Sequence, residues 1–181
     1  HGFFLGWGSD RRRLVNSGIL GLPKDSATLP ALLDLTKDEY PIPPWVKPER
    51  KEELIRLKAS GQGVHMSLMA WGICGPEALT YFATQSGEDK HAFDASVLYP
   101  VPFSATRSFH RPHLNKSIKA AITDDTISVH FYGRRFRNIF AQSDGLPLEG
   151  SYADELCKLH GVDPALTAHL FEMKVPGGAT S

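Results

Sequence analysis

The sequence predicts an α/β protein with a single domain, and three observations lead to that prediction. The chain has 181 residues, enough for one domain with a hydrophobic core and too few for two ordinary ones. Its hydrophobic fraction of 41% and charged fraction of 22% are typical of a globular protein. Short β-prone runs and amphipathic stretches are separated by Gly and Pro, which indicates both strands and helices. We therefore expect one domain over residues 1–181.

The first third of the chain predicts two strands followed by two helices. Residues 3–7 and 14–22 are short apolar runs on either side of a polar turn, a pattern that favours paired strands. Asp25 and Ser26 are residue types that commonly cap helices, so we expect a helix from there to about residue 36. Residues 49–60 are strongly charged and predict a surface helix.

The middle of the chain contains one strong helix signal. The apolar run 66–73 leads into Gly75 and Pro76, and proline is well tolerated in the first turn of a helix. We expect this helix to reach Gln85 and to end at Gly87.

Weaker signals follow. Residues 92–103 contain two prolines and predict an extended segment, and we expect residues 90–115 to lie on the surface. Residues 127–132 are β-branched and aromatic and form the most strand-like run of the second half. Ser151, with Asp154 three residues later, predicts the start of a helix that ends near residue 160.

Charge and cysteine usage exclude several classes of protein. Twenty basic residues balance twenty acidic ones, so the chain carries no overall field that would attract nucleic acid. Cys74 and Cys157 lack the spacing of a zinc site or a disulfide framework, which favours a reducing compartment. The sequence contains no run of 18 apolar residues, phosphate-binding loop, nucleophile elbow or HExxH helix. His110 and His113 flank a proline in a predicted loop, and we do not expect them to bind a metal.

Four segments in a fixed order carry a resemblance to a known family. They are FLGW with LVNSGIL at residues 4–7 and 14–20, WGICGPEALT at 71–80, FD with VLYPV at 93–94 and 97–101, and ISVHFYGRR at 127–135. The chain resembles the downstream half of bacterial glycosyltransferases with a DXD sugar-binding region, and also the C-terminal region of α-1,4-glycosyltransferases. The resemblance implies the C-terminal part of a GT-A-like fold.

The same resemblance implies an activity. It implies a hexosyltransferase that uses a UDP-sugar donor, a saccharide or glycolipid acceptor and Mn²⁺ or Mg²⁺, as in polysaccharide, lipopolysaccharide or capsule synthesis. It also implies a cytoplasmic enzyme that contacts the membrane face through its acceptor. No Asp-x-Asp occurs in the chain, and the chain starts at His1 with apolar residues close behind. We therefore expect the metal-binding aspartates to lie upstream, and little activity from this chain alone.

A second interpretation remains open, namely a non-enzymatic carbohydrate-binding or protein-interaction module. The absence of Asp-x-Asp is its main support. Binding of UDP, and its dependence on Mn²⁺, would distinguish the two interpretations.

His130 is the candidate metal ligand. It follows an apolar run that predicts a strand, where an imidazole could join carboxylates around a divalent cation. The alternative is a structural histidine that bonds a backbone carbonyl at a strand end. The resemblance favours the metal role, and we expect the side chain to face a cleft.

Gly133, Arg134 and Arg135 are the candidate diphosphate-binding residues. Glycine lets backbone amides approach a phosphate, and arginine offers a planar fork of donors. The alternative is a solvated basic edge that discourages aggregation. Adjacent side chains of an extended chain point to opposite faces, so we expect Arg134 to share the face of His130.

The remaining candidates would contact the acceptor. Asn16 lies in an apolar strand and needs hydrogen-bonding partners, from backbone or from substrate hydroxyls. Trp71 could stack on a sugar ring, although tryptophan in an apolar run is often core, and Gly75 belongs to the following turn. Asp10 and Glu77 are the candidate catalytic carboxylates, and each also has a structural interpretation, in a turn and in a first helical turn respectively.

Overall fold

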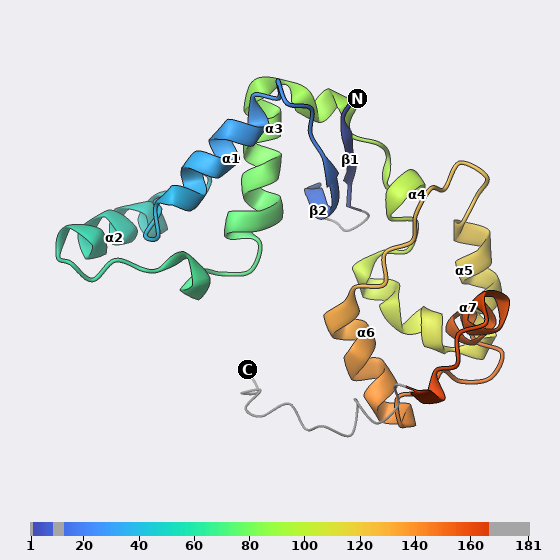
Figure 1. Cartoon of the computed structure of the whole chain (residues 1–181). Coiled ribbons are helices and arrows are strands. Elements are labelled where there is room, and N and C mark those ends of the chain that lie inside the picture. The colour runs from blue at the N-terminus through green and yellow to red at the C-terminus, as the bar shows by residue number, and fades with distance from the viewer. Residues whose placement is uncertain (1, 9–12, 167–181) are drawn as a thin grey trace. The chain divides into compact units, whose positions relative to one another are not determined.

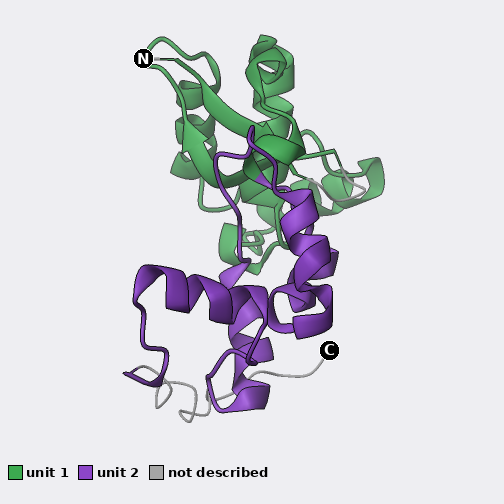
Figure 2. Cartoon of the chain, turned by 90° about the vertical axis from the view of Figure 1, so that its right-hand side faces the viewer, with its two compact units in different colours: residues 1–98 green, residues 99–181 purple. Residues whose placement is uncertain are grey.

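The computed structural model describes residues 2–8 and 13–166, and over these ranges the chain is a mixed α/β protein in which helices predominate. The α/β class predicted from the sequence is confirmed at this level. The chain divides into two compact units, residues 1–98 and 99–181 (Figure 2). The single-domain organisation stays a prediction, and Asp10 lies outside the described residues.

Unit 1 is built on a β-hairpin. Strands β1 (Phe4–Trp7) and β2 (Val15–Gly21) pair antiparallel, as the two apolar runs predict (Figure 1). A later segment joins the open edge of β1: the backbone N–H of Phe93 donates to the carbonyl of Leu5 at 2.9 Å, and that of Trp7 donates to the carbonyl of Phe93 at 3.0 Å. This bridge brings the end of unit 1 back against its first strand.

Helices and short turns complete unit 1. Its core consists of Leu5, Val15 and Leu79, each at most 1% exposed. The elements in chain order are α1 (Thr28–Lys37), α2 (Pro48–Ala59), η1 (Met66–Leu68), the π-helical turn η2 (Ile73–Glu77), α3 (Ala78–Ser86), η3 (Glu88–His91) and α4 (Ala95–Leu98).

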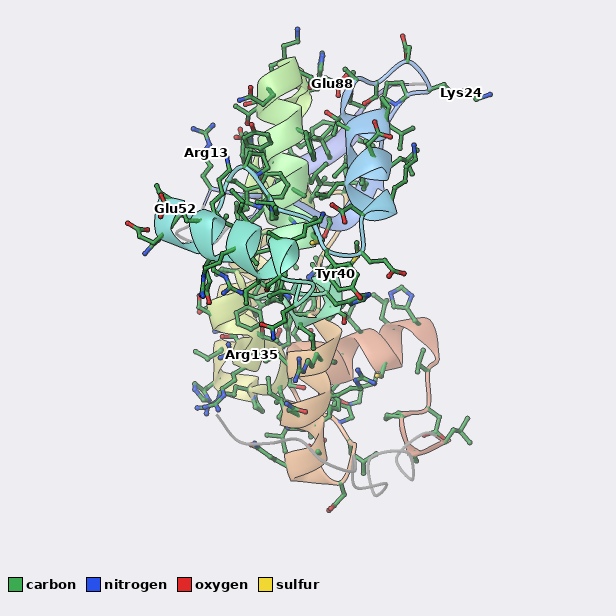
Figure 3. The ribbon with its side chains drawn as sticks, turned by 90° about the vertical axis from the view of Figure 1, so that its left-hand side faces the viewer. Arg13, Lys24, Tyr40, Glu52, Glu88 and Arg135 are labelled. Carbon is green, nitrogen blue, oxygen red and sulfur yellow. The ribbon has the colours of Figure 1, made fainter. Side chains whose placement is uncertain are left out.

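Two of the predicted helix ends are confirmed. Helix α3 ends at Gly87, whose φ of 71° is a left-handed conformation that glycine adopts without strain. Helix α1 begins close to Ser26, as predicted, but its start is held mainly by a distant carboxylate. Glu88, labelled in Figure 3, accepts hydrogen bonds from the Ser26 hydroxyl at 2.8 Å and from the backbone N–H groups of Ala27 at 2.7 Å and Thr28 at 3.1 Å.

Unit 2 is helical around an aromatic core. Val101, Phe109 and Ile118 are buried at its centre. Phe131, Phe136 and Tyr152 pack against them. The elements in chain order are η4 (Phe103–His110), η5 (Pro112–Leu114), α5 (Asn115–Ala121), α6 (Gly133–Phe140), η6 (Ala141–Ser143) and α7 (Tyr152–His160).

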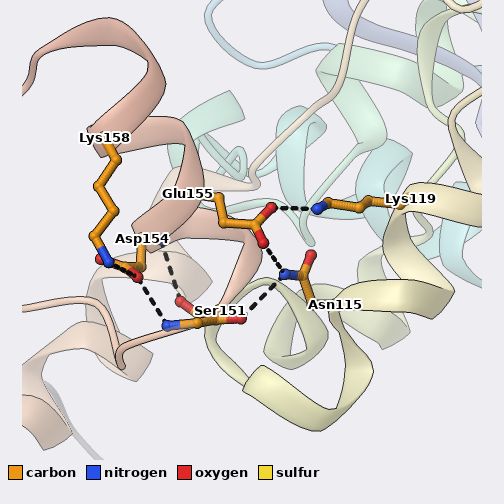
Figure 4. A network of polar contacts seen from close by, with 7 residues as sticks. Asn115, Lys119, Ser151, Asp154, Glu155 and Lys158 are labelled. Carbon is orange, nitrogen blue, oxygen red and sulfur yellow. Dashed lines mark hydrogen bonds and ion pairs between the residues drawn. The ribbon is translucent and has the colours of Figure 1, made fainter.

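A polar network ties α5 to α7 (Figure 4). The Asn115 side-chain amide donates to the Gly150 carbonyl at 3.0 Å and to the Glu155 carboxylate at 2.8 Å. Ser151 caps α7 as predicted, since its hydroxyl accepts from the backbone N–H of Asp154 at 3.2 Å. These bonds fix where α7 begins.

Three sequence-based expectations are wrong. Residues 127–132 form no strand, since no strand within the described ranges pairs with them. Val129 and Phe131 pack on the aromatic core instead, and this packing explains the β-branched and aromatic composition of the segment. Residues 92–103 are not extended throughout, since they include α4. Residues 90–115 are not a surface segment, since Tyr99 and Phe109 are fully buried.

Candidate functional site

The first cluster of candidate residues lies in unit 1, at the turn that precedes α3. Gly72 has a φ of 91°, and its carbonyl accepts a hydrogen bond from the backbone N–H of Glu77 at 2.9 Å. The carboxylate of Glu77 folds back beside Gly72, where a Cβ on Gly72 would lie 3.9 Å from Oε1. A Cβ on Gly75 would meet nothing within 4 Å, so the backbone of the turn is open to a ligand at that point.

Trp71 stands at the start of this turn and is 82% exposed. The interpretation of Trp71 as a core residue is therefore excluded. Leu68, just upstream, is 77% exposed. An indole presented to solvent in this way offers a free ring face, which is the part of tryptophan that stacks on sugars.

A pocket of about 360 Å³ opens between the start of β2 and α3. Thr80 fixes the two elements together: its hydroxyl accepts from the backbone N–H of Val15 at 2.8 Å and donates to the carbonyl of Pro76 at 2.6 Å. The pocket is lined by Leu14, Trp45, Glu77, Thr80, Tyr81, Thr84 and Gln85.

The lining of this pocket combines aromatic rings with hydrogen-bonding groups. Trp45 packs against Tyr81 with ring centroids 5.0 Å apart and forms an edge contact with Phe82 at 5.5 Å. Glu77, Thr84 and Gln85 add a carboxylate, a hydroxyl and an amide. Sequence analysis missed Trp45 and Tyr81. Trp45 lies in the proline-rich segment after α1, where an isolated tryptophan between prolines was the available signal.

Asn16 is accounted for by its own backbone environment. Its side-chain oxygen accepts a hydrogen bond from the backbone N–H of Gly18 at 2.8 Å, a local turn-like contact within β2. Asn16 follows Val15, which is bonded to α3, so it still lies close to the pocket. A substrate role for Asn16 stays a prediction.

The second cluster lies in unit 2 around His130. The imidazole makes edge contacts with Tyr99 and Tyr132, at centroid distances of 5.8 and 4.2 Å. Nδ1 is sealed from solvent and has no hydrogen-bond partner among the described residues, so a ligand could reach the ring only at Nε2. Burial lowers the pKa of His130, so the ring is neutral at neutral pH and its lone pair is available.

His130 does not end a strand, and the segment after it is not extended. Tyr132 adopts a left-handed conformation with φ 51° and starts helix α6. Its carbonyl accepts from the backbone N–H groups of Arg135 at 2.9 Å and Phe136 at 3.1 Å. The N–H groups of Gly133 and Arg134 have no acceptor in the part of the chain that the structure describes. Two amide donors therefore remain open at the positive end of the helix.

Three arginines lie on this helix, Arg134 and Arg135 in its first turn and Arg137 in its last. Arg134 and Arg137 are exposed and three residues apart, so they share one face of α6. Arg135 places its guanidinium 4.5 Å from the centre of the Phe103 ring. The expectation that the two adjacent arginines alternate like strand residues is wrong, because they lie on a helix. No carboxylate within the described ranges pairs with any of the three.

Such an arrangement costs stability unless an anion is bound. Cations near a helix N-terminus oppose the macrodipole, by about 0.3–1 kcal/mol each at exposed positions, and like charges on one face repel. A phosphate at the same place would receive open amides and guanidinium groups together. The cluster is thus suited chemically to binding a phosphate or diphosphate.

The described residues contain no group of three or more His, Cys, Asp and Glu side chains that could hold a metal ion. His130 is a single candidate ligand with no carboxylate partner shown beside it. The divalent cation stays a prediction.

Comparison with protein-family models, curated proteins and solved structures found no match. Over the described ranges, no helix has the length and apolarity needed to cross a membrane. Both cysteines are free thiols, in agreement with their spacing.

Proposed function

We propose that the chain acts in glycosyl transfer, moving a hexose from a UDP-sugar to a saccharide or glycolipid acceptor, with the architecture of a GT-A-like glycosyltransferase. The observation that carries the proposal is the start of α6, where open amides and unpaired arginines follow a half-buried neutral histidine.

The diphosphate of the donor fits this helix start. As the bond between sugar and UDP breaks, negative charge builds on the leaving diphosphate, and fixed donors that stabilise this charge lower the barrier. In this proposal the fixed donors are the amides of Gly133 and Arg134 and the side chain of Arg134. Arg135 is already engaged with Phe103 and contributes mainly its charge.

A divalent cation would neutralise further charge on the diphosphate. Nε2 of His130 is the ligand that this chain would offer. One imidazole does not hold Mn²⁺ or Mg²⁺ alone, because both prefer several oxygen ligands. The role of His130 that stands without a metal is to provide a neutral hydrogen-bonding ring beside the phosphate.

The pocket beside α3 fits the acceptor saccharide. The exposed indole of Trp71, the aromatic pair of Trp45 and Tyr81 and the carboxylate of Glu77 supply the stacking and hydrogen-bonding groups that sugars require. We propose Glu77 as the group that accepts the proton of the attacking hydroxyl, with Asp10 as the second candidate.

Calorimetric titration with uridine, UMP and UDP tests the donor site. We expect affinity to rise in that order, because each phosphate adds charge-assisted contacts. Arg134→Ala should weaken UDP binding about tenfold or more, and Arg135→Ala should weaken it less. Arg56→Ala is the matched control, since Arg56 is an exposed arginine on α2 in the other unit. Equal affinity for uridine and UDP, or an unchanged affinity in Arg134→Ala, would overturn the proposal.

The exposure of Trp71 favours a second candidate function, a carbohydrate-binding module without transfer. Such a module would bind an oligosaccharide through Trp71 and show no affinity for UDP. Titration of Trp71→Ala with oligosaccharides and with UDP separates the two functions, since only a transferase of the proposed kind binds both ligands.

A further inference from the structure

We propose that unit 2 contains a second anion site, a pocket that binds the phosphate group of a small ligand carrying an apolar portion. The pocket has a volume of about 370 Å³ and lies between η4, η5 and the region where α6 passes into η6. Its polar lining consists of Arg107, His110, Arg111, His113, Gln142 and Ser143. This proposal does not depend on the one for glycosyl transfer.

Positive charge without a counter-charge is the first observation. Arg107 and Arg111 both line the pocket and are both exposed, while the lining contains no aspartate or glutamate. Neither arginine pairs with a carboxylate among the described residues. Two arginines that line one pocket repel each other, and a bound phosphate would replace this repulsion by charge-assisted hydrogen bonds.

The buried His110 is the second, independent observation. Nε2 of His110 lies 3.1 Å from Ser143 Oγ, a hydroxyl that also lies within hydrogen-bonding distance of the carbonyls of Leu146, at 2.6 Å, and Phe140, at 3.1 Å. Nδ1, the other ring nitrogen, is buried and has no partner within the described ranges. Burial first, and then the charge of Arg111, lower the pKa of His110. A buried polar atom without a partner is costly, and functional sites retain such costs.

The remaining lining defines the ligand class. The apolar part of the lining consists of Ile139, Leu148 and Pro112. A volume of about 370 Å³ lies within the range of about 300–1,000 Å³ that is usual for small-molecule sites. The ligand that matches is a phosphate monoester with a short apolar group, either a soluble ester or the phosphate headgroup of a lipid.

This pocket is distinct from the site at the start of α6. Ile139 lies six residues after Gly133, which corresponds to about 9 Å along a helix axis. The two sites therefore use opposite ends of α6 and different arginines. Substitution of one set should leave the other site intact.

Calorimetric titration with octyl phosphate, inorganic phosphate and octanol tests the proposal. We expect octyl phosphate to bind, inorganic phosphate to bind more weakly, and octanol not to bind. Arg111→Ala and Arg107→Ala should each weaken octyl phosphate binding about tenfold, while the control Arg56→Ala should leave it unchanged. Arg111→Gln, a second substitution at this exposed position, should weaken binding in the same way. Circular dichroism of each variant shows whether the loss of binding comes from unfolding instead.

Sedimentation with phosphatidylcholine vesicles that contain phosphatidic acid distinguishes the two sources of the phosphate. Binding that is lost in Arg111→Ala identifies a lipid headgroup, and octyl phosphate binding without vesicle binding identifies a soluble ester. Octyl phosphate affinity that is unchanged in Arg107→Ala and Arg111→Ala, or reduced equally by Arg56→Ala, would overturn the proposal.

Discussion

The carboxylate of Glu88 should stabilise unit 1 in a pH-dependent way. Burial opposes the charged form of Glu88, but hydrogen bonds from Thr28, Ser26 and Ala27 outweigh it and lower the pKa of Glu88 from 4.5 to about 2. These donors belong to the start of α1, 60 to 62 residues away along the chain. Glu88 therefore acts as an N-terminal cap supplied by another part of the fold.

The magnitude follows from the shift in pKa. The pKa of Glu88 falls by about 2.5 units, from 4.5 to about 2, which would correspond to about 3.4 kcal/mol of stability if the carboxylate were fully buried. The side chain is only partly buried, so we expect Glu88→Gln to lower the free energy of unfolding of unit 1 by about 1–2 kcal/mol at pH 7.

The sign of the pH dependence is fixed by the direction of the shift. A carboxyl group with a depressed pKa contributes its stability above pH 4.5, and this contribution is lost as the pH falls towards 2. The difference between wild type and Glu88→Gln should therefore shrink by about half or more between pH 7 and pH 3.

Tryptophan fluorescence during urea unfolding is the appropriate assay. All three tryptophans, Trp7, Trp45 and Trp71, lie in unit 1, so the signal reports this unit. Glu52→Gln, on the exposed face of α2, is the matched control and should change stability by less than about 0.5 kcal/mol. A loss in Glu88→Gln that is equal at pH 7 and pH 3 would refute the reasoning.

Two further substitutions test the helix boundaries. Gly87→Ala should destabilise unit 1 by about 1 kcal/mol, because Gly87 has a φ of 71°, which is strained for alanine. The added Cβ would meet no atom within 4 Å, so the cost comes from the backbone conformation alone. Tryptophan fluorescence measures the loss of stability, and an unchanged stability would contradict the left-handed cap. Asn115→Ala should destabilise the junction of α5 and α7 by about 1–3 kcal/mol and increase hydrogen exchange in α7. Lys119→Ala, which removes only the exposed ion pair with Glu155, should cost less than about 1 kcal/mol, and an equal effect would count against the buried amide as the anchor.

The elements that the sequence predicted correctly are those with local signals. The end of α3 at Gly87 and the Ser151 cap of α7 are determined by the conformation of a few neighbouring residues. The hairpin of β1 and β2 was predictable because the two apolar runs are close together in the chain. Such signals do not depend on distant packing.

The failures occur where distant contacts decide the structure. Residues 127–132 have a strand-like composition, but this composition serves the contact of Phe131 with Phe109, whose ring centroids are 4.7 Å apart. The cap of α1 by Glu88 spans about 60 residues and has no sequence signature. Neither contact could be predicted from one sequence, because both depend on the tertiary arrangement.

For the candidate site in unit 2, the secondary structure predicted around the selected residues was wrong, and their role stays a prediction. His130, Gly133, Arg134 and Arg135 were selected for their chemistry, which does not depend on the secondary structure around them. The prediction of a strand end placed Arg134 and His130 on one face, whereas α6 begins between them. The helix adds open backbone amides that a strand would not have offered.

The placement of Arg134 leads to a last prediction, in which stability and binding should change in opposite directions. Arg134→Glu places a carboxylate at the positive end of α6 and three residues before the exposed Arg137. The macrodipole and the new pair should together stabilise α6 by about 0.5–1 kcal/mol, measured as slower hydrogen exchange of its amides. The same variant should lose UDP binding in calorimetry, because a carboxylate repels the diphosphate. If stability alone decided the residue at the start of α6, a glutamate would be favoured over Arg134. A variant that is more stable but no longer binds UDP would therefore identify Arg134 as a binding residue. If Arg134→Glu is less stable than wild type, or binds UDP equally well, the anion site is not at this helix start.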